Sequence, residues 1–140
     1  MSDAGKAYFG RRYLVSASHR LHTPALTAEE NRAAYGKCNN AHGHGHNYVV
    51  EVLVGGAVDK ETGMVVDLVA LDKAVDERIV HRFDHANLNV DPLFQDRVPT
   101  TENFCRAIFA LLQDAMPTGE LEYVRVEETE NNFFECSARG

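Results

Sequence analysis

The sequence predicts an α+β domain, in which an antiparallel sheet of four strands carries two helices on one face. Four runs have the alternating or β-branched composition of strands, and two amphipathic helical stretches lie together between the second and third runs. Strands and helices grouped in this way, instead of alternating, favour an antiparallel sheet over a parallel one. A length of 140 residues, 44% of them hydrophobic, is enough for one core, so we expect a single domain over residues 1–140.

Composition narrows the classes of function. The formal net charge is −7, which argues against a surface that coats nucleic acid. No apolar run has the length of a transmembrane helix, and residues 1–12 lack the apolar stretch of a signal peptide. Three cysteines in no paired pattern are typical of a reducing compartment. We therefore expect a soluble, cytoplasmic protein that binds neither nucleic acid nor a membrane.

The first predicted strand runs from Tyr13 to His19. Its alternation places Tyr13, Val15, Ala17 and His19 on one face. His19 thus ends a mainly apolar face, a position that suits either a buried core histidine or a metal ligand. The strand alone leaves both interpretations open.

The connection after this strand contains a short helical turn and then a loop. We expect the turn over Ala28–Ala34, because Thr27 and Glu30 form the pattern of a capping box. Residues 36–42 are rich in turn formers and contain Cys38. Cysteines that serve only packing usually lie in apolar runs, so Cys38 in this loop favours a chemical role.

The second strand begins with two histidines, His44 and His46, and continues to Val54. Side chains two residues apart on a strand point to the same face, so both imidazoles point the same way as Tyr48. With His19 they make three imidazoles, a set typical of Zn²⁺ with a fourth position left for substrate or water. A lone His-x-His pair is also common in surface turns that bind no metal.

Two helices follow the second strand. Asp67 is the expected N-cap of the first, whose apolar stripe fades near His81. The pair Asp84–His85 comes after its end, and taken alone such a pair favours a solvated surface. A proline followed by a threonine cap, Thr100, begins the second helix. The predicted stripes are Leu68, Leu71, Val75 and Ile79 in the first helix, and Phe104, Ile108, Leu111 and Ala115 in the second.

The last two strands cover Leu121–Glu128 and Phe133–Ala138. Glu128 falls in phase with Val124 and Val126, and a carboxylate on a buried face is costly unless it is paired. Glu128 therefore needs a partner or a ligand. A four-stranded sheet also leaves two free edges, which proteins usually cover or pair, so we expect oligomerisation through the sheet.

Six short blocks, in order, resemble the motif series of the 6-pyruvoyl tetrahydropterin synthase family. Any one block would be a weak signal, but the six extend from Tyr13 to Ala138, over nearly the whole chain. The blocks are Ser16–Leu21 (SASHRL), Tyr35–Asn40 (YGKCNN), Gly43–Tyr48 (GHGHNY), Asp84–Leu88 (DHANL), Thr100–Asn103 (TTEN) and Glu127–Thr129 (EET).

The resemblance implies a fold, a reaction and a set of site residues. The fold is the tunnelling fold, in which three protomers join their sheets into a β-barrel, two trimers stack into a homohexamer, and active sites lie between subunits. The substrate is a pterin triphosphate, 7,8-dihydroneopterin triphosphate, and the product is 6-pyruvoyl tetrahydropterin, formed with loss of triphosphate. By resemblance, Zn²⁺ is held by His19, His44 and His46, Cys38 is the catalytic base, Asp84 and His85 form a proton relay, and Glu128 anchors the pterin ring with Thr100, Thr101 and Glu102 nearby.

His42 departs from the family pattern and leaves the ligand register open. His42 with His44 is a second possible pair, since Cys38 and His42 have the Cys-x-x-x-His-Gly-His spacing of bacterial relatives. We choose His44 with His46, because His46 leads directly into the strand. Those relatives are 6-carboxy-tetrahydropterin synthases of the queuosine (deazapurine) route, and this is the alternative activity.

A third reading belongs to another class: a zinc-binding oligomeric scaffold without turnover. Cys38, Asp84, His85 and Glu128 argue against it, because a structural metal site would need none of them. The binding of the triphosphate is the remaining question. Arg20 and Lys37 are candidates for it, and ordinary surface charge explains them equally well.

Overall fold

Two strands of 13 residues each form the centre of the sheet. In the computed structural model, which describes residues 5–138, β1 (Ala7–His19) and β2 (His44–Gly56) pair antiparallel along their whole length. The register sets His19 directly opposite His44. Alternation located only the second half of β1, from Tyr13 onward, because the first half contains Gly10 and two arginines and lacks a regular apolar face.

The complete sheet has five strands in the order β3-β1-β2-β4-β5 and is mixed. The prediction of a four-stranded, purely antiparallel sheet is therefore wrong in strand number and in the direction of one strand. The added strand, β3 (Ala86–Asn87), runs parallel to the end of β1. Alternation cannot reveal a strand of two residues, which backbone pairing alone defines. β4 (Glu120–Glu127) pairs antiparallel with β2, and β5 (Phe133–Ser137) pairs antiparallel with β4.

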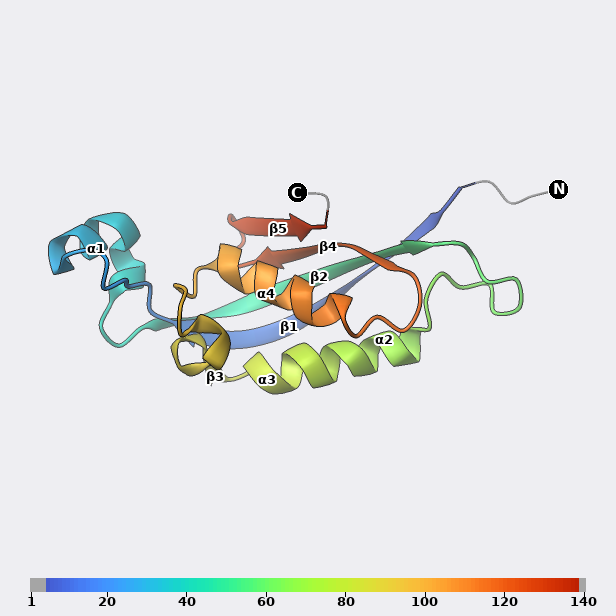
Figure 1. Cartoon of the computed structure of the whole chain (residues 1–140), viewed down its shortest axis with the longest axis horizontal. Coiled ribbons are helices and arrows are strands. Elements are labelled where there is room, and N and C mark those ends of the chain that lie inside the picture. The colour runs from blue at the N-terminus through green and yellow to red at the C-terminus, as the bar shows by residue number, and fades with distance from the viewer. Residues whose placement is uncertain (1–4, 139–140) are drawn as a thin grey trace.

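The α+β class is confirmed, with helices against one face of the sheet, as Figure 1 shows for α2 and α4. The short α1 begins with the predicted capping box of Thr27 and Glu30. In α4 the buried stripe passes through Leu112 where the spacing predicted Leu111, which is only partly buried. The helices are α1 (Ala28–Tyr35), α2 (Leu68–Val75), α3 (His81–Phe83) and α4 (Thr101–Gln113).

The helix predicted after Asp67 is present, but its second half is irregular. Asp67 caps α2 by accepting a hydrogen bond from the Ala70 N–H at 3.0 Å. A π-helical turn over Asp76–Val80 joins α2 to α3, and no sequence pattern distinguishes it. The helical segment ends at Asp84, which is thereby brought beside β1.

One layer of buried side chains joins the sheet to the helices. On β2 every second residue from Tyr48 to Val54 is buried and faces α4 and α2. Tyr48 stacks edge-on against Phe104 of α4, which also contacts Phe83. This core fixes the position of the first residues of β2, since they continue the same alternation.

The opposite face of the sheet, here called the open face, carries polar and exposed side chains. Leu14 is 71% exposed on this face. Glu51 accepts hydrogen bonds from Arg12 Nε at 2.9 Å and from the Tyr123 hydroxyl at 2.5 Å. Within residues 5–138 the outer edge of β5 has no strand beside it. The same part of the chain contains no helix that is long and apolar enough to cross a membrane.

Candidate metal and catalytic site

Three imidazoles meet where β1 ends and β2 begins. His19 lies opposite His44, and His46 follows two residues later on the same face. The ring centroids of His19 are 5.1 Å from those of both His44 and His46, which are 4.7 Å from each other. Their Nε2 atoms are buried and find no hydrogen-bond partner among residues 5–138. Buried polar atoms are rarely left unpaired, so three neighbouring Nε2 atoms without partners fit the binding of a cation.

A backbone carbonyl orients the first of these rings. His19 is 1% exposed, and its Nδ1 lies 2.9 Å from the carbonyl oxygen of Pro99. The Tyr48 hydroxyl lies 3.4 Å from the same nitrogen. These contacts leave Nε2 as the free nitrogen, an arrangement typical of histidines that bind metals. Sequence reasoning missed Pro99 because a carbonyl carries no residue signature, whereas Tyr48 shared the phase of His44 and His46.

Burial favours the neutral form of two of the imidazoles. Desolvation lowers the pKa of His19, and it lowers the pKa of His46 despite the opposing charge of Glu128. A neutral imidazole has a lone pair to offer, which an imidazolium lacks. The electrostatic setting therefore suits metal binding near neutral pH.

Cys38 is held close to this group by its own backbone. It lies in a 3₁₀ turn, Gly36–Asn39, whose Cys38 carbonyl accepts a hydrogen bond from the Leu21 N–H at 2.7 Å. Ligand atoms of His19, Cys38 and Glu128 lie within 4.8 Å of one another. Burial, and then the charge of Glu128, raise the pKa of the Cys38 thiol above its ordinary value. A nearby cation would be needed to offset this and make the thiolate available.

Glu128 lies just after β4, and its side chain is 13% exposed. Its Oε2 accepts a short hydrogen bond from the hydroxyl of Thr101, a buried residue of α4. Its Oε1 lies 3.4 Å from His46 Nε2 without making a hydrogen bond to it. The Glu128 carboxylate, which the sequence pattern placed in phase with two valines, thus has one oxygen in a hydrogen bond. Its other oxygen is free to accept a hydrogen bond.

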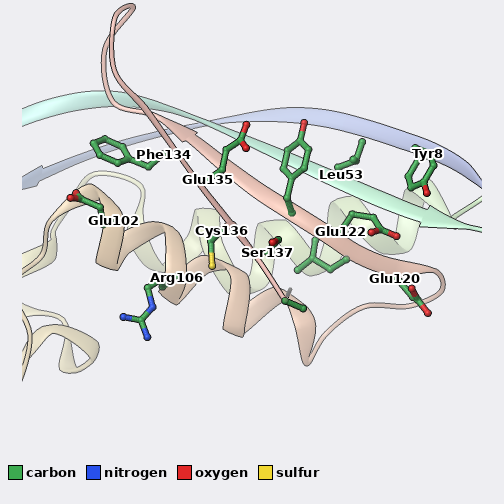
Figure 2. A pocket seen from close by; sticks show the side chains of 13 residues that line it. Tyr8, Leu53, Glu102, Arg106, Glu120, Glu122, Phe134, Glu135, Cys136 and Ser137 are labelled. Carbon is green, nitrogen blue, oxygen red and sulfur yellow. The ribbon is translucent and has the colours of Figure 1, made fainter. Parts of the chain in front are cut away.

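The block Thr100–Glu102 does not act as one unit. Thr100 caps α4 by accepting a hydrogen bond from the Asn103 N–H at 3.2 Å. Glu102 lies on another side of the helix and lines a cavity of about 900 Å³ that the imidazoles do not reach. Figure 2 shows Glu102 and Arg106 on α4, at this cavity, with Phe134 above them. Of the three residues in this block, only Thr101 forms a hydrogen bond with Glu128 in the described part of the chain.

Asp84 and His85 lie at the β1 edge of the sheet, where the His85 side chain borders the open face. Asp84 Oδ1 accepts a hydrogen bond from the Ser16 N–H at 2.8 Å, and Oδ2 lies 3.5 Å from His85 Nε2. The His85 side chain is 83% exposed and borders a cavity of about 330 Å³ that also includes Ser16 and Asn47. Ser16 alternates with the buried residues of β1, so the Ser16 side of this cavity belongs to the open face, although His46 also borders the cavity. One chain therefore does not bring Cys38 and His85 together.

The remaining candidates lie at the edge of the site. His42 is exposed and falls outside the group formed by His19, His44 and His46. It borders a cavity of about 260 Å³ together with Arg20, whose Nε donates to the Asn39 carbonyl at 3.4 Å. Lys37 is exposed in the 3₁₀ turn beside Cys38.

The chain is similar to known proteins over most of its length. The family model described as 6-pyruvoyl tetrahydropterin synthase matches residues 10–139. A human 6-pyruvoyl tetrahydrobiopterin synthase is 49% identical over 129 residues, which cover 91% of this chain and 89% of the human one. A putative 6-carboxy-5,6,7,8-tetrahydropterin synthase of Archaeoglobus fulgidus is 39% identical over 111 residues, 79% of this chain and 88% of the relative.

The fold comparison points the same way. The structure of Caenorhabditis elegans 6-pyruvoyl tetrahydropterin synthase is similar with a TM-score of 0.92 and 38% sequence identity, and the match covers 99% of both chains. A match of the family model over nearly the whole length, close relatives and a shared fold lead to one conclusion. The chain belongs to the 6-pyruvoyl tetrahydropterin synthase family.

Proposed function

We propose that the chain is a zinc-dependent lyase that converts 7,8-dihydroneopterin triphosphate into 6-pyruvoyl tetrahydropterin with loss of triphosphate. One observation carries the proposal: three buried Nε2 atoms, which have no hydrogen-bond partner within the described chain, lie beside a thiol and a carboxylate. The higher identity to a 6-pyruvoyl tetrahydrobiopterin synthase than to a putative 6-carboxy relative, 49% against 39%, supports this product.

His19, His44 and His46 would hold the zinc through their Nε2 atoms, and the donor set fits, since it consists of three imidazoles of which two are favoured in the neutral form. When bound, the ion supplies Lewis acidity to hydroxyls of the substrate side chain and so acidifies the adjacent C–H bond. The Pro99 carbonyl keeps His19 in the orientation that this role requires.

Cys38 is the proposed base. Its sulfur belongs to a group with His19 and Glu128 whose ligand atoms lie within 4.8 Å of one another, close enough for the thiolate to take a proton from a substrate held there. Because burial raises its pKa, the thiolate form depends on positive charge nearby.

Glu128 and Thr101 form the proposed pterin anchor. The Thr101 hydroxyl occupies Oε2 of Glu128 and leaves Oε1 to accept from N–H groups of the pterin ring. Thr100 and Glu102 were expected beside them. Thr100 would contribute indirectly, by capping α4, and Glu102 faces another cavity, which favours no contact with the ring.

Asp84 and His85 are the proposed proton relay of a neighbouring subunit. Asp84 is fixed by the Ser16 N–H, and His85 projects from the open face. A homohexamer of two stacked trimers, joined through sheet edges, would bring His85 of one subunit towards Cys38 of the next. The unpaired edge of β5 in the described residues supports such joining. Cytoplasmic location is part of the proposal, since Cys38, Cys105 and Cys136 are all free thiols.

Product analysis tests the proposal. The zinc-loaded protein is incubated with 7,8-dihydroneopterin triphosphate, and the products are identified by mass. We expect 6-pyruvoyl tetrahydropterin and free triphosphate. Carboxy-tetrahydropterin with release of acetaldehyde would establish the alternative activity, and unchanged substrate with bound zinc would favour the scaffold.

A further inference from the structure

A second group of potential metal ligands overlaps the three imidazoles. Ligand atoms of His19, Cys38 and Glu128 all lie within 4.8 Å of one another, as do those of the three histidines. Both groups contain His19, whose Nδ1 is engaged by the Pro99 carbonyl at 2.9 Å. Only Nε2 of His19 is left, and one nitrogen lone pair binds one ion. The two groups are therefore alternatives that cannot both be filled through His19.

The two groups differ in donor chemistry. Three imidazoles are a set that zinc prefers, whereas a thiolate with one imidazole and one carboxylate is softer. A cysteine that coordinates a metal gives up its proton outright, so a protonated Cys38 does not prevent binding. A thiophilic divalent cation therefore has a reason to choose the second group over the first.

We propose that His19, Cys38 and Glu128 form an inhibitory site for thiophilic divalent cations, with Cd²⁺ as the probe. The proposal rests on the proposed function, because inhibition follows from the roles assigned there. Binding replaces the S–H bond of Cys38 by an S–Cd bond and releases the proton to solvent. The ion would then occupy the base and the pterin anchor together.

The contacts that position His19, Cys38 and Glu128 can all remain when a cation binds. Cys38 is tied to Leu21 through its carbonyl, and Leu21 follows His19 by two residues. Glu128 keeps its Oε2 on Thr101 and turns Oε1 towards His46 Nε2, 3.4 Å away. A cation needs only the free oxygen, the sulfur and one nitrogen, so no hydrogen bond of the described residues has to break.

The test uses full-length protein stripped of metal and titrated with CdCl₂. Two signals are followed: the ultraviolet charge-transfer absorption of a cadmium thiolate, and alkylation of Cys38 by iodoacetamide, mapped by peptide mass. At a pH high enough for iodoacetamide to alkylate Cys38 in the metal-free protein, we expect Cd²⁺ to produce the absorption in wild type and to abolish this alkylation. One equivalent of Zn²⁺ should leave Cys38 open to alkylation, since zinc takes the imidazoles.

Variants separate this site from other thiols and from the first group. Cys38→Ser should lose the absorption, while the matched control Cys136→Ser, at a half-buried cysteine of β5, should keep it. His44→Ala should also keep it, because His44 belongs only to the imidazole group. Glu128→Gln, a second variant with little change of shape, should bind Cd²⁺ more weakly and retain the thiolate signal.

Three results would overturn the proposal. Cd²⁺ bound to wild type without thiolate absorption would mean that the ion occupies the imidazoles. Absorption that survives Cys38→Ser would belong to Cys105 or Cys136. Loss of absorption in a folded His44→Ala would mean one shared site instead of two alternatives. Turnover of the zinc-loaded protein, measured separately, reports the proposed function. A Cys38-dependent signal without turnover would contradict that function, and with it the inhibitory effect, but would leave the cation site in place.

Discussion

The Nε2 atom of His46 lies 3.4 Å from Oε1 of Glu128, and this contact joins the candidate metal ligands to the candidate pterin anchor. His46 belongs to β2, and Glu128 directly follows β4, which pairs with β2. The Thr101 hydroxyl on α4 holds the other oxygen of Glu128. A bound metal and a bound pterin ring would therefore be neighbours. Substitution of the histidines should affect metal binding, and substitution of Glu128 should affect binding of the ring.

Glu128→Gln is expected to keep zinc and to lose substrate binding. The amide retains the shape but removes the charge, and it places a donor or a weaker acceptor where N–H groups of the pterin would donate. Truncating one side of a buried, hydrogen-bonded charge pair costs about 2–5 kcal/mol. Substrate affinity, by calorimetry, and zinc content, by metal analysis, are the measurements. Glu127→Gln is the matched control, since Glu127 alternates with the buried residues of β4 and should leave both unchanged.

The ligand register gives a second prediction. His19→Ala, His44→Ala and His46→Ala should each lose zinc, because three imidazoles leave no spare ligand. His42→Ala should keep it, since His42 is exposed and outside the group. Metal analysis of the four purified variants decides this. Zinc retained by His46→Ala but lost by His42→Ala would reverse the register.

The period of two in β-strands is what made much of this predictable. It placed His44 and His46 on one face and Glu128 in phase with valines, and the structure brings His19 to the same point by pairing β1 with β2. The sequence blocks predicted the site wrongly where adjacent residues of one block point in different directions in the structure. Thr101 and Glu102 are adjacent, but successive residues of a helix are rotated by about 100°, so only Thr101 reaches Glu128.

Other features had no sequence signal at all. The Pro99 carbonyl orients His19 through a backbone atom that every residue carries. The two-residue strand β3 is defined by its backbone pairing with β1, and the π-helical turn Asp76–Val80 is a local change of hydrogen-bond spacing within a helical segment that has no distinct composition. Between them they place Asp84 against Ser16, a contact that no periodicity could have located.

Cys38→Ala should retain zinc and bind substrate but lose turnover, since the sulfur is proposed as base and not as ligand. The pH dependence follows from the raised pKa of Cys38. In metal-free protein the thiol stays protonated at neutral pH, so its alkylation by iodoacetamide should rise only at pH above the ordinary thiol value. Zinc loading should move that rise to lower pH. If Cys38→Ala loses zinc, the sulfur is a fourth ligand and the site is closed.

Asp91→Asn should lower the free energy of unfolding at neutral pH and change it little at acidic pH. Arg82 donates to both oxygens of Asp91, at 2.9 and 2.8 Å, and this bond is the main cause of the lowered pKa of Asp91. A carboxyl group whose pKa is lowered by folding stabilises the folded state at pH above its pKa in the unfolded chain, which is about 4. This stabilisation disappears as the pH falls through the pKa of the folded state. The Arg82 side chain is 34% exposed, so solvent screening limits the loss to about 1 kcal/mol. Urea unfolding at about pH 7 and about pH 3 measures it, and an equal loss at both would contradict the ion pair's role.

The last prediction concerns catalysis across subunits. Asp84 is fixed to Ser16 at 2.8 Å and His85 projects from the open face, whereas Cys38 lies with the imidazoles. A site within one chain therefore has no relay beside its base. Cys38→Ala and His85→Ala should each form nearly inactive oligomers. Unfolding and reassembling the two together should restore activity at seams that take Cys38 from one parent and His85 from the other.

The expected recovery can be stated. In a ring of head-to-tail contacts, each interface combines Cys38 of one subunit with His85 of the next. In an equal mixture each of these residues is unsubstituted in about half of the subunits, so about one interface in four has both. Activity should therefore return to roughly a quarter of that of wild type treated in the same way. Gel filtration must give the same oligomer for the mixture as for wild type. Mixed oligomers of the correct size that stay inactive would place the base and the relay in one chain, and would require a rearrangement that brings His85 from the open face to Cys38.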